Sequence, residues 1–99
     1  MIILNALYKK PSNSDAFHVY YEEVHMPLAL TIPGLVKAEA EMVSATFSGN
    51  KDDHYMLARL YFANEDSFKA AMQSEQNKAT GKDLRNFADG GVDLFITRT

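Results

Sequence analysis

The chain has 99 residues, of which 46% are hydrophobic and 23% are charged, a composition typical of a folded protein of one domain. It contains no cysteine, which excludes disulfides, thiolate catalysis and thiolate metal sites. The formal net charge of -3, without a long run of Lys or Arg, argues against a nucleic-acid partner. We expect one domain over residues 1–99.

Hydropathy gives a first expectation about location. No apolar run reaches the length that a membrane-spanning helix needs, and no basic leader precedes the apolar residues at the start of the chain. We therefore expect a cytoplasmic protein without a membrane partner.

The first elements in chain order are a strand and a helix. Residues 2–8 contain no Gly or Pro and end at a cluster of turn-forming residues, which predicts a strand. From Ser14 onward, apolar residues follow the spacing of an amphipathic helix, with Asn13 or Ser14 as its N-cap. These apolar residues are Phe17, Tyr20, Tyr21, Val24 and Leu28. Pro27 removes one backbone donor inside this pattern, so we expect a kink or break near Met26.

A β-hairpin follows the first helix. Residues 35–46 alternate between apolar and polar side chains, which predicts a long strand. Residues 47–53 form a polar loop, and residues 54–62 return as a third strand.

The last third of the chain predicts two helices and a strand. Asn64 can cap a second helix. Thr80, followed three residues later by Asp83, resembles a capping box, which predicts a separate short helix over residues 82–88. Residues 92–97 then predict the fourth strand.

The order β-α-β-β-α-β indicates an α+β fold of the ferredoxin-like type, a four-stranded antiparallel sheet with both helices on one face. The other face is then open. Alternation along the third strand places four residues there, and they are Tyr55, Leu57, Arg59 and Tyr61. Exposed apolar faces of this size usually mark interfaces, so we expect a homodimer whose sheets meet face to face as a barrel.

Histidine is the candidate for acid/base chemistry, since its ordinary pKa of about 6.5 permits proton exchange at cellular pH. His18, Tyr21 and His25 share one ridge of the predicted helix. His18 and His25 are two helical turns apart, about 10 Å along the axis, which is too far to share one metal ion. His54 lies on another element, and no HExxH spacing occurs, so no metal site is expected.

His25 is the sharper candidate because Pro27 follows two residues later, and a kink would orient the imidazole toward a cavity. A structural histidine with local hydrogen bonds explains the same residues equally well. Tyr55, Arg59 and Tyr61 supply polar tips on the open face, suited either to a ligand inside a barrel or to packing between subunits.

The segment Phe17–Leu28, with His25-Met26-Pro27 and the following Pro33-Gly34-Leu35, resembles the signature of the EthD family. Residues 86–91 also resemble the sequence of that family. The resemblance covers most of the chain. It implies a dimeric α+β barrel, related in fold to muconolactone isomerases and small cofactor-free monooxygenases, in a group named for ethyl tert-butyl ether degradation. Fungal relatives include dehydratases and decarboxylases of aromatic polyketides. The family histidine corresponds to His25.

Three functions are compatible with these features, and none of them requires a cofactor. The first is a lyase or isomerase acting on a small apolar or aromatic molecule, bound between the first helix and the sheet. Here His25 is the general acid/base, and the ligand-binding residues are Tyr21, His18, Tyr55, Arg59 and Tyr61. The second is a cofactor-free monooxygenase. The third is a non-catalytic accessory protein that holds a hydrophobic metabolite for a partner oxidase.

Overall fold

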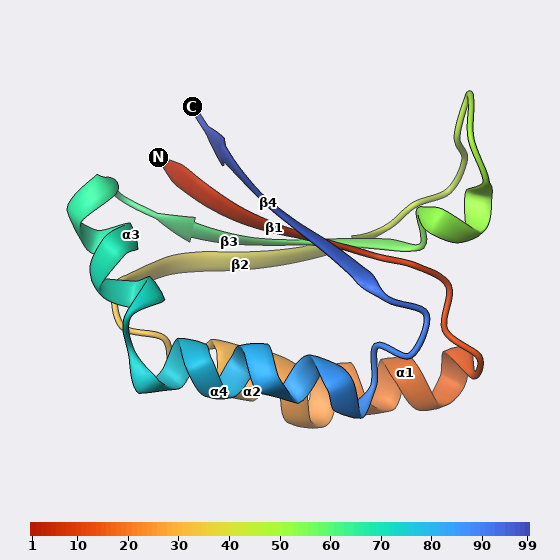
Figure 1. Ribbon diagram of the computed structural model, residues 1–99, viewed down its shortest axis with the longest axis horizontal. Coiled ribbons are helices and arrows are strands. Elements are labelled where there is room, and N and C mark those ends of the chain that lie inside the picture. The colour runs from red at the N-terminus through yellow and green to blue at the C-terminus, as the bar shows by residue number, and fades with distance from the viewer.

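The computed structural model describes residues 1–99 and consists of a twisted sheet with a layer of helices on one face (Figure 1). The strands are β1 (Ile2–Tyr8), β2 (Leu35–Met42), β3 (Met56–Phe62) and β4 (Val92–Arg98). Their order in the sheet is β2-β3-β1-β4, and every neighbouring pair is antiparallel. The predicted ferredoxin-like α+β fold is confirmed.

The helical layer consists of two antiparallel stretches beneath the sheet (Figure 1). Its elements are α1 (Ser14–Tyr20), η1 (Tyr21–His25), α2 (Met26–Ala29), α3 (Glu65–Met72), α4 (Glu75–Asp83) and the 3-10 turn η3 (Leu84–Asn86). A second 3-10 turn, η2 (Lys51–Asp53), belongs to the hairpin between β2 and β3. The side chains of Asn13 and Asn64 accept backbone N–H hydrogen bonds and cap α1 and α3, as the sequence predicts. None of the helices combines the length and the apolar character that crossing a bilayer requires.

The first helical stretch runs through Pro27 without a break near Met26, and the irregularity before the proline is a π-helical turn. Met26 has φ -64° and ψ -44°, and its N–H donates to the carbonyl of Tyr21, five residues earlier. This wider π-helical turn changes the positions of the carbonyls that the proline ring would otherwise meet, and Pro27 then lies in the first turn of α2. The π turn leaves Tyr21 and His25 buried.

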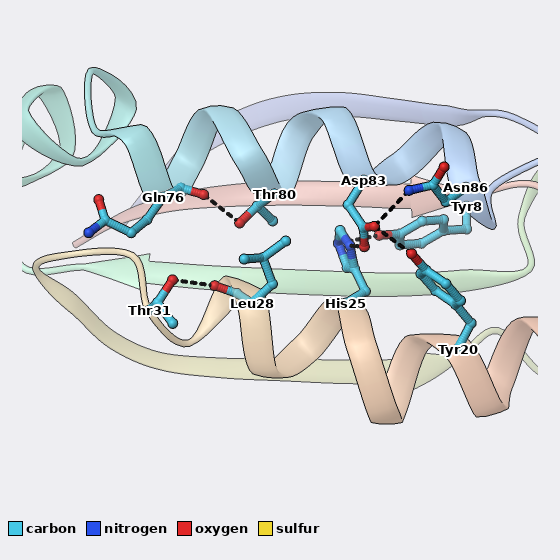
Figure 2. Close-up of polar contacts among 9 residues, drawn as sticks. All are labelled: Tyr8, Tyr20, His25, Leu28, Thr31, Gln76, Thr80, Asp83 and Asn86. Atoms are coloured by element: carbon cyan, nitrogen blue, oxygen red, sulfur yellow. Dashed lines mark hydrogen bonds and ion pairs between the residues drawn. The ribbon is translucent and has the colours of Figure 1, made fainter.

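The second helical stretch begins earlier than the capping-box pattern predicts. The Ser74 hydroxyl accepts the N–H of Asn77 at 3.1 Å and caps α4. Thr80 lies inside α4, where its hydroxyl donates to the Gln76 carbonyl (Figure 2). The prediction of a separate helix over residues 82–88 is therefore wrong, because the Thr80–Asp83 spacing occurs within a helix.

The core between sheet and helices has an aliphatic end and an aromatic end. The aliphatic cluster contains Ile2, Ala29, Ile32, Phe62, Phe68 and Ala71. The aromatic cluster contains Tyr8, Phe17, Tyr21, Met56, Ala58 and Phe87. The Tyr8 ring lies edge-on to Phe17 and Tyr21, with centroids 5.4 and 6.0 Å apart, a favourable arrangement for aromatic pairs.

The face of the sheet away from the helices is uncovered. Residues directly opposite in neighbouring strands point the same way, so this face carries Leu57, Arg59 and Tyr61 of β3, as predicted. Phe95 of β4 lies on the same face and is 43% exposed. The prediction that Tyr55 lies on the open face is wrong, because its ring packs on the helix side, 5.7 Å from the Phe17 ring. The chain bends before β3 begins, so the alternation of the strand does not extend to Tyr55.

Candidate functional site

A buried polar cluster joins the two helical stretches at the aromatic end of the core (Figure 2). His25 comes from η1 and Asp83 from the last turn of α4, and they are 5% and 8% exposed. His25 Nδ1 lies 2.9 Å from Asp83 Oδ2. The Tyr20 hydroxyl donates to Asp83 Oδ1 at 2.6 Å, and the Asn86 side-chain amide donates to the same oxygen at 3.0 Å. One carboxylate therefore accepts from three side chains.

This carboxylate determines which nitrogen of His25 carries the proton. An ionised carboxylate only accepts hydrogen bonds, so the facing Nδ1 is protonated and Nε2 of the neutral ring is an acceptor. Nε2 faces the Tyr8 hydroxyl at 3.5 Å. The pair has the orientation by which a carboxylate positions a histidine base in hydrolytic triads. The arrangement therefore presents one basic nitrogen in a buried setting.

The pKa values of the cluster keep the histidine neutral. Burial lowers the pKa of His25, and this outweighs the raising effect of Asp83 beside it. Burial acts to raise the pKa of Asp83, but the hydrogen bonds from Tyr20, Asn86 and His25 together hold it below its usual value. Burial raises the pKa of Tyr8 well above its usual value, so its hydroxyl remains a donor.

The lowered pKa of His25 predicts a loss of stability on mild acidification. Between about pH 7.5 and 5.5 an unfolded histidine with a pKa of about 6.5 binds a proton that folded His25 does not bind, so the free energy of unfolding falls with pH. Because the pKa of Asp83 is also lowered, the free energy of unfolding falls further below about pH 4, where the stabilising contribution of this carboxylate is lost. Urea unfolding should show a flatter pH dependence in His25→Gln than in the wild type from pH 7.5 to 5.5. Equal slopes would contradict this prediction.

A cleft of about 190 Å³ lies between the first helical stretch and the sheet. Its walls are His18, Tyr21, Glu22, Ala40, Glu41, Met42 and Met56. His18 Nε2 is 2.7 Å from the Tyr55 hydroxyl, which fixes the orientation of this imidazole. His25 is not part of the wall; its ring lies 5.7 Å from that of Tyr21, which does line the cleft. Burial raises the pKa of Tyr21 to about 12, so its phenol is protonated at cellular pH.

The structure divides the predicted site residues between two places. His18, Tyr21 and Tyr55 lie at or beside the cleft, with His25 close to Tyr21. Arg59 and Tyr61 lie on the opposite face of the sheet. There Arg59 pairs with Glu41, and the Lys37 ammonium lies 4.5 Å from the centre of the Tyr61 ring. No three His, Asp or Glu side chains gather closely enough to hold a metal ion.

Sequence reasoning missed Asp83, Tyr20 and Tyr8. Tyr20 and Tyr8 fit the apolar patterns of a helix and a strand, which do not reveal that their hydroxyls meet buried partners. The capping-box spacing assigns Asp83 to a helix start. The signal for its true position is weak, since α4 is mostly polar and buries only Thr80 and Asp83, three residues apart on one face.

Comparison with known proteins places the chain among relatives of similar length. Residues 9–91 match the family described as the EthD domain. An uncharacterized 11.0 kDa protein of Rhodococcus erythropolis, from the thcB-thcC intergenic region, is 33% identical over 97 residues, which are 98% of this chain and 93% of the relative. The crystal structure of an ethyl tert-butyl ether d (EthD) family protein from Bacillus halodurans C-125 is 31% identical with a TM-score of 0.89, covering 100% of this chain and 98% of that one.

A more distant structure shares the fold alone. A dimeric ferredoxin-like protein of unknown function from Thermobifida fusca YX is 14% identical with a TM-score of 0.71, covering 99% of this chain and 90% of that chain. The family match spans most of the sequence, including His25 and Asp83, and the relatives with about a third of their residues identical align over nearly their whole length. The chain belongs to the EthD family.

Proposed function

We propose that the protein binds a small apolar or aromatic molecule in the cleft between the first helical stretch and the sheet, and acts on it as a cofactor-independent lyase or isomerase. The observation that carries this proposal is a histidine on the cleft wall, His18, held by the Tyr55 hydroxyl at 2.7 Å. Ala40, Met42 and Met56 supply the apolar part of the wall. A concave, mainly apolar site with few oriented polar groups is what small ligands require.

In this proposal His18 contacts the ligand and transfers the proton. The Tyr55 hydroxyl restrains the imidazole ring, so that a proton moves to or from a defined position. The Phe17 ring meets the His18 imidazole edge-on at 5.3 Å and restrains it from the core side. The Tyr21 phenol, protonated at neutral pH, is the adjacent donor for a ligand oxygen.

His25 is the second candidate base, and its pair with Asp83 favours it. The carboxylate directs the basic Nε2 away from itself, but this atom faces Tyr8, and Tyr21 separates the ring from the cleft. In this arrangement His25 does not line the cleft. Its other role is structural, since the pair joins η1 to α4.

The test begins with native mass spectrometry of the purified protein, which identifies any retained small molecule, followed by turnover of that molecule. His18→Gln is expected to retain the ligand and to lose turnover by about 100-fold or more, because a glutamine keeps hydrogen bonds but does not titrate. His25→Gln is expected to lower turnover less than His18→Gln does.

Other outcomes separate the alternatives. Full turnover in His18→Gln with loss in His25→Gln would assign the base to His25, and full turnover in both would reject histidine catalysis. Consumption of oxygen with the ligand would identify a cofactor-free monooxygenase. A retained ligand without turnover would indicate an accessory binding protein.

We also propose that two copies pair through the open face of the sheet. The supporting observations are Leu57 and Phe95 on a face that no helix covers, and the dimeric state of the ferredoxin-like protein from Thermobifida fusca. Arg59 and Tyr61 then lie between the two sheets, apart from the cleft beside His18.

A further inference from the structure

A second cleft, of about 220 Å³, lies at the end of the sheet where β1 leads into α1. The β2–β3 hairpin extends beyond the sheet at this end (Figure 1). The cleft lies between Lys10, the chain that follows β2, and the hairpin residues Lys51 and Asp52. The Lys10 N–H donates to the Asp52 carbonyl at 2.7 Å, which ties the hairpin to the end of β1.

The walls of this cleft carry uncompensated positive charge. Lys10 and Lys51 line it, Asp52 is its only carboxylate, and neither lysine takes part in any of the ion pairs of the chain. Ser44 and Thr46 add hydroxyl donors. Cations gathered in a concave site favour an anionic group, although the protein as a whole has a net charge of -3.

The two clefts adjoin each other. Met42 lines the first cleft, and the next residue, Val43, lines the second. Likewise, Met56 lines the first cleft and the preceding residue, Tyr55, lines the second. The hydrogen bond between His18 and Tyr55 joins a wall residue of one cleft to a wall residue of the other. The candidate base therefore lies at the junction of the two spaces.

The charges of the two clefts differ in sign. Glu22 lines the first cleft from η1, whereas the charge of Glu41 is compensated by its pair with Arg59. Glu22 therefore repels an acid group from that end, and the lysines attract it to the other. Each space alone is smaller than the roughly 300 Å³ of ordinary ligand pockets. Together they suit one small molecule with an acid group at one end.

We propose that the two clefts form one elongated site for a small aromatic or apolar carboxylate. The carboxylate lies between Lys10 and Lys51, and the apolar body extends past the Tyr55 ring to the side of His18. This inference rests on the proposed function and specifies its substrate class. The carboxylate fixes the position of the carbon skeleton relative to the imidazole.

The test compares two probes of similar shape, benzoate and neutral benzyl alcohol, by NMR titration of the whole protein. Benzoate is expected to bind about tenfold more tightly, and the double variant Lys10→Met/Lys51→Met is expected to remove this advantage without changing benzyl alcohol binding. Lys69→Met is the matched control, since Lys69 is exposed on α3 and lines neither cleft. Ala40→Phe fills the first cleft and is expected to weaken both probes.

Each contrary result has a distinct meaning. Equal binding of the two probes, both blocked by Ala40→Phe, would overturn the carboxylate preference and leave the apolar cleft of the proposed function in place. A lysine-dependent preference that Ala40→Phe does not affect would overturn the joined site. Absence of benzoate binding would overturn this inference, while the proposed function is judged separately by its co-purified ligand. Thermal unfolding of each variant verifies that it is folded.

Discussion

Replacement of Asp83 by alanine is expected to lower the free energy of unfolding by about 3 kcal/mol, because it removes a buried charged acceptor from three donors. Tyr20, His25 and Asn86 all direct hydrogen bonds to this carboxylate, and His25 is 5% exposed, so water cannot easily replace the lost acceptor. Urea unfolding at pH 7.5 measures the change. Asp53→Ala is the matched control, since Asp53 is exposed in η2, away from the open face of the sheet, and forms no ion pair.

The isosteric change Asp83→Asn sharpens this prediction. An asparagine can accept the bonds of Tyr20 and Asn86 with its oxygen, but it then presents its amide group to His25 Nδ1. The His25 proton is therefore expected to move from Nδ1 to Nε2, with a smaller loss of stability than in Asp83→Ala. Nitrogen chemical shifts of the imidazole report the tautomer. An unchanged tautomer, or an Asp83→Ala protein as stable as the wild type, would refute the role assigned to this carboxylate.

Phe95→Glu is expected to convert the proposed dimer into monomers, raising its dissociation constant by about 100-fold or more. Phe95 is 43% exposed in the single chain, so a glutamate there costs the protomer little. In a symmetric pair both copies would bury the new charge at an apolar interface, at a large desolvation cost. Light scattering over a range of micromolar concentrations measures the effect.

Val19→Glu is the control for this experiment. Val19 is 55% exposed on α1, on the helical side of the molecule, so the same chemical change there should leave the dimer intact. A wild-type protein that is monomeric at micromolar concentration would contradict the dimer, and dissociation by both variants would place the interface elsewhere.

The sequence was most informative where local periodicity determines structure. The strand predicted over residues 2–8 is β1 with the same bounds, and the strand predicted over residues 92–97 is one residue shorter than β4. Asn13 and Asn64 identify helix starts because a cap acts on N–H groups two or three residues away. These interactions connect near neighbours in the chain, so a window of a few residues contains them.

The tertiary structure decided which buried polar groups meet. His25 and Asp83 are 58 residues apart, and their contact depends on how η1 packs against α4. Tyr55 turns to His18 because the chain bends before β3, a feature that alternation does not encode.

The sequence by itself therefore determined the order of elements, the open face of the sheet and two histidines on one helical ridge. Only the tertiary structure placed His18 on a cleft and His25 in a buried pair. The physical reason is that apolar periodicity records which side of an element avoids water. The partner of a buried hydrogen-bonding group is determined by packing between elements distant in sequence.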